Sequence, residues 1–341
     1  MKALVKPAPE PGLVLADVAV PEPGPDEVRI AVKEAAICGT DLHIHEWDDW
    51  ASTHLDPPLI VGHEFFGTVD AVGERVDTVE VGQRVAGEGH IVCGTCRNCR
   101  AGRHHLCRET SGVGVNRDGA FAEYIVLPAS NVYVLPDALP DDIAALLDPL
   151  GNAVHTALSF DLVGEDVLIT GAGPIGQMAL AICRHAGARH VVITDIEPTR
   201  LAQAAAMGAS RAVDPRATSL EAVMQELGMR EGFDVGLEMS GSGDGLADMI
   251  DAMNHGGKIA LLGLFGAAAA VDMNKVILKG LTLKGIYGRE MYDTWHKALA
   301  MISTGLDVSP VITHRFPLEQ FEAAFDALKA GEAGKIILDI G

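Results

Sequence analysis

A glycine-rich turn between two hydrophobic segments constrains the fold of this chain more than any other feature. The β-favouring residues 167–170 run directly into Gly171, Gly173 and Gly176, which have the spacing Gly-x-Gly-x-x-Gly. Residues 177–186 are apolar and rich in helix formers, and a second buried strand, predicted over 191–194, ends at Asp195. A strand, a glycine turn, a helix and an acid nineteen residues past the last glycine together predict a dinucleotide-binding βαβ unit.

Each residue of this turn has a physical task in such a unit. Gly171 permits the tight turn, Gly173 lets the backbone approach a pyrophosphate, and Gly176 lets the helix pack closely against the strand. The helix N-terminus offers free N–H groups and the positive end of a dipole to the phosphates. Pro174 is tolerated in the first turn, because its missing N–H would have no partner within the helix.

Asp195 also indicates which dinucleotide is bound. At the end of the second strand its carboxylate is expected to accept hydrogen bonds from the adenosine ribose hydroxyls. Its charge would repel a 2′-phosphate, so NAD is favoured over NADP. Arg200 complicates this interpretation, since a nearby arginine can accommodate that phosphate.

The length of the chain and a change in its local sequence pattern indicate two domains. A chain of 341 residues, 48% of them hydrophobic, is longer than one compact core of usual size. Residues 1 to about 150 consist of short alternating runs separated by proline and glycine, which is typical of an antiparallel domain. After residue 151, strands and helices alternate, and further strands predicted over 211–213, 235–239, 258–262 and 282–286 complete a six-stranded, doubly wound parallel sheet.

The charge and hydropathy exclude several classes of partner. A formal net charge of -21 argues against binding to nucleic acid or to an anionic membrane surface, because both attract basic patches. The longest uncharged apolar run, 259–271, is too short to span a bilayer, and the first residues lack the apolar segment of a secretory signal. We therefore expect a cytoplasmic protein.

Four of the six cysteines are crowded into one short segment. Their pattern is Cys93-x-x-Cys96-x-x-Cys99-x7-Cys107. In a long chain with no signal peptide, this spacing indicates metal ligation by thiolates rather than disulfides. Four thiolates close a tetrahedral zinc site with no open position, so the predicted role of this metal is structural. Cys183, in the middle of a predicted helix, is interpreted as a core residue.

A second ligand set is more widely spaced. Cys38, His63 and Glu64 offer a thiolate, an imidazole and a carboxylate, which a catalytic zinc takes when one position stays open. Taken singly, these residues could equally be a buried free cysteine, a core histidine and an exposed glutamate. Together with a dinucleotide-binding unit, the set favours a metal-dependent oxidoreductase.

These features resemble the zinc-dependent medium-chain alcohol dehydrogenase family. The segment Gly62-His-Glu-x-x-Gly67, with a further Gly73, the four-cysteine segment and the later glycine turn occur in that family's order and spacing. The resemblance implies a β-rich, GroES-like catalytic domain over 1–150, a Rossmann domain over 151–292 and a return to the catalytic domain over 293–341. It also implies two zinc ions per subunit, one catalytic and one structural, and a homotetramer.

The chain further resembles the branch of the family that oxidises L-threonine at C3. The matching segments are 37–44, 87–90, 112–116, 148–156, 232–241, 253–257 and 285–291. Carried over by position, the resemblance makes Thr40 and His43 a proton relay, gives Asp148 a part in catalysis beside the zinc, and associates His90 with substrate choice. It also implies the following NAD contacts: Gly171, Gly173, Ile175, Gly176, Asp195, Arg200, Leu262, Gly263, Leu264, Ile286 and Tyr287.

The expected activity is oxidation of L-threonine to L-2-amino-3-oxobutanoate, with the proton leaving through Thr40 and His43 and the hydride passing to NAD. His90 and Arg289 are candidate partners for the substrate carboxylate, and Asp148 or Glu290 for its ammonium. Two alternatives stay open. One is a polyol or 2,3-butanediol dehydrogenase, which would use the same metal chemistry. The other is a non-catalytic NAD(P)-binding protein, although such a protein would have no need of an open metal site.

Overall fold

The chain folds into two compact units. The computed structural model describes residues 1–331 and 333–341. One unit comprises Met1–Pro149 and Ile312–Gly341, and the other comprises Leu150–Val311. The first unit is therefore discontinuous in sequence, with the second inserted into it.

The second unit is built on a parallel sheet in the order β13-β12-β11-β14-β15-β16. Its strands are β11 (Asp166–Thr170), β12 (His190–Thr194), β13 (Arg211–Val213), β14 (Phe233–Glu238), β15 (Met253–Leu261) and β16 (Thr282–Gly285). All six lie where the sequence predicts them. The order reverses between β11 and β14, so the carboxyl ends of these two strands form a topological switch point of the kind that binds dinucleotides.

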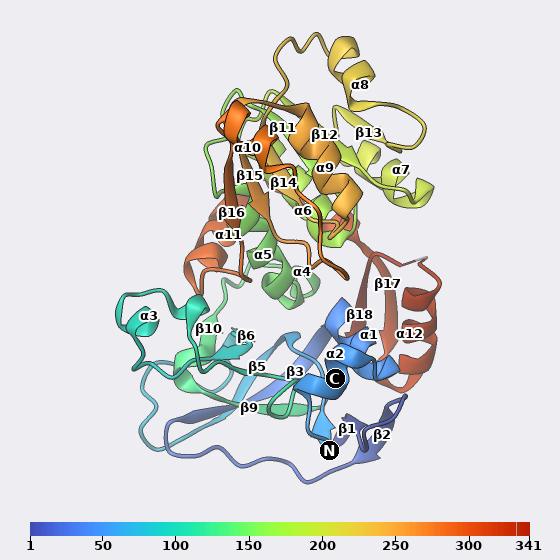
Figure 1. The fold of residues 1–341 in the computed structure, drawn as a ribbon. Helices are drawn as coiled ribbons and strands as arrows, with labels where there is room; N and C mark the ends of the chain where they lie inside the picture. Colours follow the sequence, from blue (N-terminus) through green and yellow to red (C-terminus); the bar gives the residue numbers. More distant parts are fainter. Residues whose placement is uncertain (332) are drawn as a thin grey trace. The chain divides into compact units, whose positions relative to one another are not determined.

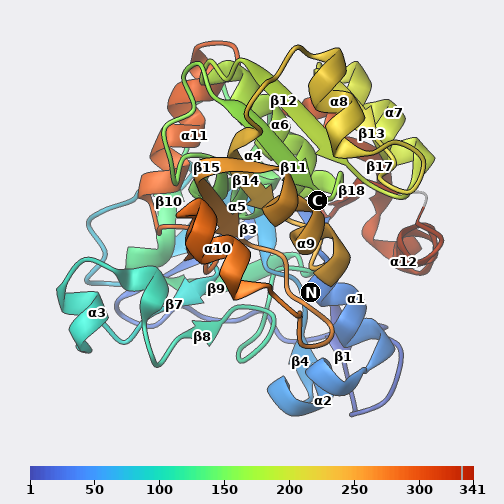
Figure 2. The ribbon, with the colours of Figure 1, turned by 45° about the horizontal axis from the view of Figure 1, so that its top comes forward.

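Helices connect these strands or, in the case of α11, follow the last of them. They are α6 (Pro174–His185), α7 (Pro198–Ala206), α8 (Leu220–Glu226), α9 (Gly243–Ala252), α10 (Met273–Lys279) and α11 (Asp293–Ser303), followed by the 3₁₀ turn η3 (Ser309–Val311). Helix α7 packs beside β12 and β13, and α9 packs on β11 and β14 (Figure 2). Because right-handed crossovers lead outward in both directions from the switch point, the helices cover both faces of the sheet.

The first unit is centred on an antiparallel sheet in the order β10-β6-β5-β3-β18-β17, in which β9 also pairs with β3 and only β17 and β18 are parallel. Its strands are β3 (Glu27–Ile37), β5 (Glu64–Val72), β6 (Arg84–Gly87), β9 (Tyr124–Pro128), β10 (Val132–Val134), β17 (Ile312–Pro317) and β18 (Lys335–Asp339). The returning C-terminal segment thus pairs with β3, as Figure 1 shows for β18.

Smaller elements complete this unit. They are the strands β1 (Lys2–Lys6), β2 (Val14–Asp17), β4 (Leu59–Ile60), β7 (His90–Ile91) and β8 (Ser111–Gly112), the helices α1 (Gly39–Glu46), α2 (Asp49–His54), α3 (Arg97–Arg100), α4 (Asp141–Ala145) and α12 (Phe321–Lys329), and the 3₁₀ turns η1 (His104–Leu106), η2 (Ala129–Asn131) and η4 (Leu318–Gln320). Helix α5 (Leu147–Ala157) contains the boundary between the units. The buried core joins residues from both stretches of the chain, among them Ile30, Phe65, Phe325 and Ile336.

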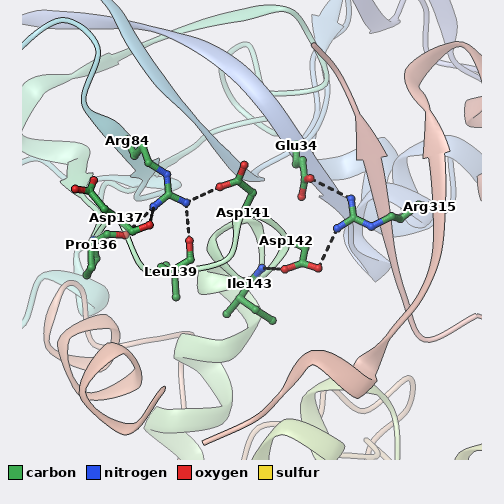
Figure 3. A network of polar contacts seen from close by, with 9 residues as sticks. All are labelled: Glu34, Arg84, Pro136, Asp137, Leu139, Asp141, Asp142, Ile143 and Arg315. Atoms are coloured by element: carbon green, nitrogen blue, oxygen red, sulfur yellow. Dashed lines mark hydrogen bonds and ion pairs between the residues drawn. The ribbon is translucent and has the colours of Figure 1, made fainter. Parts of the chain in front are cut away.

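An ionic network fastens the returning strand β17 to the first unit (Figure 3). Arg315 of β17 contacts Glu34 of β3 at 3.0 Å and Asp142 of α4 at 2.9 Å, and also Asp339 of β18 at 3.2 Å. Asp142 lies just before the chain enters the second unit, and Arg315 lies just after it returns. The Arg315 guanidinium therefore links the segment that leaves the first unit to the segment that returns to it.

The return to the first unit comes later than the expected boundary at 293. Helix α11 remains with the second unit, which extends to Val311. Its Trp295 is 1% exposed and packs so closely on α5 that a Cβ at Gly151 would meet the indole nitrogen at 3.1 Å. This packing is not visible in the local sequence pattern around residue 293. Within the described part of the chain, no helix is long and apolar enough to cross a membrane.

Candidate active site

Helix α1 presents a thiol, a hydroxyl and an imidazole in succession. Cys38 is the N-cap, and its backbone N–H donates to Asp41 Oδ2 at 2.8 Å. Thr40 Oγ1 lies 3.9 Å from Cys38 Sγ. His43 follows three residues after Thr40, so the two side chains emerge from the same face of the helix.

The imidazole and carboxylate of the predicted ligand set come from the start of β5. Gly62, immediately before them, has φ +92, and a Cβ there would lie 2.3 Å from the Phe121 ring. Only glycine allows both this backbone conformation and this close packing. The turn brings His63 and Glu64 to Cys38, so that one ligand atom from each residue lies within 4.8 Å of the others. A sulfur, a nitrogen and an oxygen in this cluster fit a zinc ion with an open position.

Asp41 lies directly behind His63. Its Oδ1 is 3.6 Å from His63 Nδ1, and both atoms are buried with no hydrogen-bond partner among the described residues. Burial would lower the pKa of His63, but the charge of Asp41 and the hydrogen bond and charge of Cys38 raise it to about 10. A zinc ion held by the other ring nitrogen would leave the hydrogen on Nδ1, the atom that faces Asp41, and carboxylates commonly accept this hydrogen behind ligand histidines.

Glu64 is paired with a buried lysine from the last strand. Lys335 Nζ lies 2.7 and 2.5 Å from the two carboxylate oxygens. The side chains of Lys335 and Glu64 are 5% and 1% exposed. Burial would lower the pKa of Lys335, but the negative charge of Glu64 raises it. Burial raises the pKa of Glu64, and the charge of Lys335 opposes that rise, so the lysine is the counter-ion of the candidate ligand.

Asp148 and His90 both lie in the first unit. Asp148 is 9% exposed, and its charge helps to raise the pKa values of His63 and Glu64, which places it close to the candidate metal site. The His90 backbone N–H donates to Glu88 Oε1 at 3.0 Å, and its ring Nδ1 is 3.3 Å from the same oxygen. Glu88 is fully buried and so holds His90 in place.

The four-cysteine segment forms a separate lobe between β7 and β8, around the short helix α3 (Figure 2). Its sulfurs lie within 4.8 Å of one another, and all four cysteines are free. The Cys96–Cys99 and Cys93–Cys107 sulfur pairs are each 3.5 Å apart, near the ~3.8 Å edge of a tetrahedron with ordinary zinc–sulfur bonds. The lobe therefore fits a closed zinc site.

Backbone amides favour the thiolate form of two cysteines in this lobe, Cys96 and Cys107. Cys107 Sγ accepts from the N–H groups of Cys93 and Glu109, both at 3.4 Å. Backbone N–H groups of Cys99 and Arg108 lower the pKa of Cys96 to about 6. Such donors stabilise the anionic form that a metal needs. Cys183, by contrast, is fully buried in α6, and burial raises its pKa to about 12, in keeping with the core role expected of it.

The glycine turn of the second unit has the geometry its sequence predicts. Gly171 has φ +89, and a Cβ at Gly176 would lie 2.0 Å from the Gly171 carbonyl oxygen. Gly173 is the N-cap of α6, Pro174 stands in its first turn, and Ile175 follows half-buried. The free N–H groups of this helix N-terminus fit a pyrophosphate.

Asp195 stands at the end of β12 and organises the same turn. Its Oδ2 accepts from the Ala172 N–H at 2.7 Å, and its Oδ1 accepts from the N–H groups of Ile196 and Glu197 at 2.7 and 3.0 Å. Arg200 Nη1 lies 3.9 Å from Oδ2. The carboxylate thus holds the glycine turn in place.

The remaining predicted cofactor residues follow β15 and β16. Leu262 and Gly263 donate their N–H groups to the Glu238 carbonyl, whereas Leu264 is 92% exposed. Ile286 is buried and Tyr287 is 57% exposed. A Cβ at Gly241, after β14, would lie 2.3 Å from the Leu264 carbonyl oxygen, so the loops after β14 and β15 touch. These residues therefore gather at the carboxyl edge of the sheet.

Comparison with known proteins agrees with this geometry. The family "Alcohol dehydrogenase GroES-like domain" matches residues 24–137, and "Zinc-binding dehydrogenase" matches residues 174–304. A curated protein from Anaeromyxobacter sp. (strain Fw109-5), named L-threonine 3-dehydrogenase, is 60% identical over 342 residues and covers all of both chains. The chain belongs to the zinc-dependent medium-chain alcohol dehydrogenase family. The predicted fold class, an α/β protein with GroES-like and Rossmann parts, is confirmed.

Solved structures of this dehydrogenase family have the same fold. An alcohol dehydrogenase from Escherichia coli CFT073, in complex with NADH, is 28% identical with a TM-score of 0.91, covering 100% of this chain and 99% of that one. The 2R,3R-butanediol dehydrogenase from Bacillus subtilis is 26% identical with a TM-score of 0.90 and the same coverage. The likeness in fold thus extends to dehydrogenases with different substrates.

Several side chains that support these sites were not predicted from the sequence. Asp41, Lys335 and Glu88 each support a predicted residue, and Asp48 contacts His43. In the second unit, fully buried Glu238 accepts from the N–H groups of Ser240 and Gly241 at 2.9 and 3.0 Å. For Lys335 and Glu238 a signal was available in the charge itself, because a lysine or an acid within an apolar strand needs a buried partner.

Proposed function

We propose that this protein oxidises L-threonine at C3 to L-2-amino-3-oxobutanoate, while NAD accepts the hydride and becomes NADH. The observation that carries this proposal is the 60% identity, over the whole length of both chains, to a protein named L-threonine 3-dehydrogenase. The metal-ligand set, the cysteine lobe and the glycine turn described above supply the parts that such an oxidoreductase needs. The chain is accordingly a zinc- and NAD-dependent dehydrogenase.

Each metal has a clear set of donors. Cys38, His63 and Glu64 would hold the catalytic zinc, and the four cysteines of the lobe would hold the structural one. When bound at the first site, zinc supplies a Lewis acid that lowers the pKa of an alcohol. Asp41 orients His63, and Lys335 limits the negative charge that Glu64 brings to the site.

The chain's own residues would remove the hydroxyl proton. Thr40 Oγ1, 3.9 Å from Cys38 Sγ, would accept the proton of the substrate hydroxyl and pass its own proton to His43. The His43 side chain is 56% exposed, so it can release the proton to water. Asp148, close to the same site, would assist this transfer rather than serve as a permanent ligand.

The second unit would bind NAD along the carboxyl edge of its sheet. The α6 N-terminus would hold the pyrophosphate, and Asp195 would accept from the adenosine ribose hydroxyls, with Arg200 beside it. The segments Leu262–Leu264 and Ile286–Tyr287 would contact the nicotinamide half. The charge of Asp195 at the ribose position favours NAD over its 2′-phosphorylated form.

Threonine differs from a simple alcohol by an ammonium and a carboxylate, and each charge needs a partner when it is desolvated. In the first unit, His90 would face the carboxylate and Asp148 the ammonium. Arg289 is 2% exposed and stacks on Trp295, with its guanidinium carbon 5.7 Å from the ring centroid, which makes it the weaker candidate for the carboxylate. Glu290 remains a candidate for the ammonium.

We also propose that the protein is a homotetramer in the cytoplasm, with no nucleic-acid or membrane partner. These proposals follow from the family resemblance and from the net charge of -21. Size-exclusion chromatography with light scattering would test the assembly, for which four copies are expected.

The alternative within the family is a polyol or 2,3-butanediol dehydrogenase, a class to which the Bacillus subtilis structure belongs. NADH formation should therefore be measured at 340 nm with L-threonine, L-serine, sorbitol, 2,3-butanediol and ethanol. We expect threonine to be the best substrate. A protein that binds NAD and zinc but oxidises none of the five would instead support the non-catalytic alternative.

A further inference from the structure

We propose that Asp48 is a positioning residue of the proton relay, which holds His43 in the tautomer that can accept the proton. This inference rests on the proposed relay of Thr40 and His43. Asp48 would accept a hydrogen bond from the Nδ1–H of His43 and so leave the Nε2 lone pair as the only acceptor on the ring. The proton of Thr40 Oγ1 would then form the new N–H bond at Nε2, as Thr40 takes the substrate proton.

The contact that carries the proposal joins two neighbouring helices. His43 Nδ1 in α1 lies 2.5 Å from Asp48 Oδ2. An ionised carboxylate can only accept, so Nδ1 must carry a hydrogen at this distance. In a neutral imidazole the lone pair is then on Nε2. The tautomer of His43 thus follows from its partner.

Asp48 is itself held in place by a helix cap. Its second oxygen, Oδ1, accepts from the Ala51 backbone N–H at 3.0 Å, so Asp48 is the N-cap of α2. Trp47, between the two helices, ends α1 in the left-handed conformation with φ 55. The sharp turn holds the carboxylate between the two helices. One of its oxygens caps the N-terminus of α2, and the other contacts the relay histidine.

The charge of Asp48 is suited to this position. The Ala51 N–H lowers the pKa of Asp48 against a smaller opposing effect of burial, and His43 lowers it further. The carboxylate is therefore ionised at neutral pH and stabilises the imidazolium that forms when His43 takes a proton. The two side chains are 56% and 38% exposed, so the imidazolium can return its proton to water.

Other charged groups around α1 face elsewhere. From α12, Lys329 pairs with Glu46 at 3.8 Å, and together with Asp326 it acts on His45, on a different face of α1 from His43. From α2, the His54 ring stacks on Trp50 with centroids 4.8 Å apart. Trp50 lies beside His43, with ring centroids 6.0 Å apart.

The remaining acid of α2, Asp49, has an exposed side chain with no hydrogen bond or ion pair to His43 in the described structure. Asp48 is thus the carboxylate that meets the relay histidine, and Asp49 offers a matched control.

Asp48→Ser separates the two tasks of the carboxylate. Serine is as good an N-cap as aspartate, but it has one oxygen, which would lie at the Ala51 N–H, so the oxygen that contacts His43 is lost. We expect an unchanged melting temperature, an unchanged KM for NAD, and kcat lowered about ten-fold or more, since the relay loses an oriented base. Asp48→Asn, which removes the charge, should move the acid limb of the kcat–pH profile to lower pH. Asp49→Ser, the matched control, should change neither kcat nor the profile.

The His43→Ala background distinguishes failure of this inference from failure of the relay itself. If His43→Ala alone keeps wild-type kcat, the relay assignment is wrong. If His43→Ala is slow but Asp48→Ser has wild-type kcat and an unshifted profile, the role of Asp48 is overturned. It is also overturned if Asp48→Ser lowers kcat equally with and without His43. The inference predicts that Asp48→Ser has no further effect once His43 is absent.

Discussion

Lys335 Nζ forms two short contacts with the carboxylate of Glu64, at 2.5 and 2.7 Å, and neither side chain is exposed by more than 5%. Glu64 begins β5 and Lys335 begins β18, and both strands pair with β3. The last strand of the chain therefore supplies the counter-ion of a candidate zinc ligand. Without metal, Lys335 is the nearest positive charge that keeps this carboxylate from being buried alone.

Replacing this lysine should destabilise the metal-free protein most. Lys335→Met removes the cation that is hydrogen-bonded to a buried carboxylate, a change that costs about 3–5 kcal/mol in other proteins. Bound zinc would offset part of this loss. We therefore expect a larger fall in the free energy of unfolding after chelation than in the zinc-loaded protein, measured by urea denaturation. The double variant Glu64→Gln with Lys335→Met should recover stability, and a single variant as stable as wild type without metal would contradict this account.

Removing one cysteine of the lobe should release a single metal. Cys96→Ser leaves three thiolates, so zinc content should fall from two ions per chain towards one, and the melting temperature should fall because the lobe is no longer closed. The site at Cys38 should keep its zinc. The matched control is Cys183→Ala. This variant removes a buried thiol outside the lobe, whereas Cys96 is half-buried, and it should leave both ions in place. Two zinc ions in Cys96→Ser would rule out a four-thiolate site.

Asp195 should control the choice of cofactor. Asp195→Ala removes the predicted ribose acceptor and also releases the Ala172 N–H of the phosphate turn. Loss of a charged hydrogen bond corresponds to roughly ten-fold or more in affinity, so KM for NAD should rise and the ratio of kcat/KM for NAD to that for NADP should fall. Asp214→Ala, a similar loss at the end of β13, should leave the ratio unchanged. A wild-type protein that uses both cofactors equally would contradict the role of Asp195.

The network around Arg315 should give a pH-dependent stability (Figure 3). Burial raises the pKa of Glu34 above 4.5, and Arg315 opposes that rise. A raised folded-state pKa means that ionising Glu34 costs stability as pH rises through this window. Arg315→Met should enlarge that cost, so it should destabilise by about 1 kcal/mol at pH 7 and by less near pH 4.5. Lys297→Met, in the exposed pair with Asp293, should show no such trend. Equal destabilisation at both pH values would contradict this role.

Local sequence patterns predicted those parts of the molecule whose residues lie close together in the sequence. The turn at Gly171–Gly176 and the four-cysteine lobe are of this kind, because spacing alone determines which atoms can meet. Lys335 could not be paired with Glu64 in advance, since their contact depends on how β18 joins β3. The place of α11 in the second unit likewise depends on Trp295 packing against Gly151, a contact between distant parts of the chain. Asp48 lies only five residues after His43, so a contact between them was possible from the sequence. Nothing in the local sequence, however, shows which oxygen of Asp48 caps α2 and which contacts His43.

The specificity for threonine over an uncharged secondary alcohol tests the central claim most directly. The measurement is kcat/KM with NAD for L-threonine and for 2,3-butanediol, which keeps the secondary alcohol but has neither the ammonium nor the carboxylate. A site built to pair both charges rejects an analogue that lacks them by a factor on the order of 10⁴. We therefore expect a preference for threonine of that order. Equal values, or a preference for the diol, would contradict the proposed function and indicate a general zinc alcohol dehydrogenase.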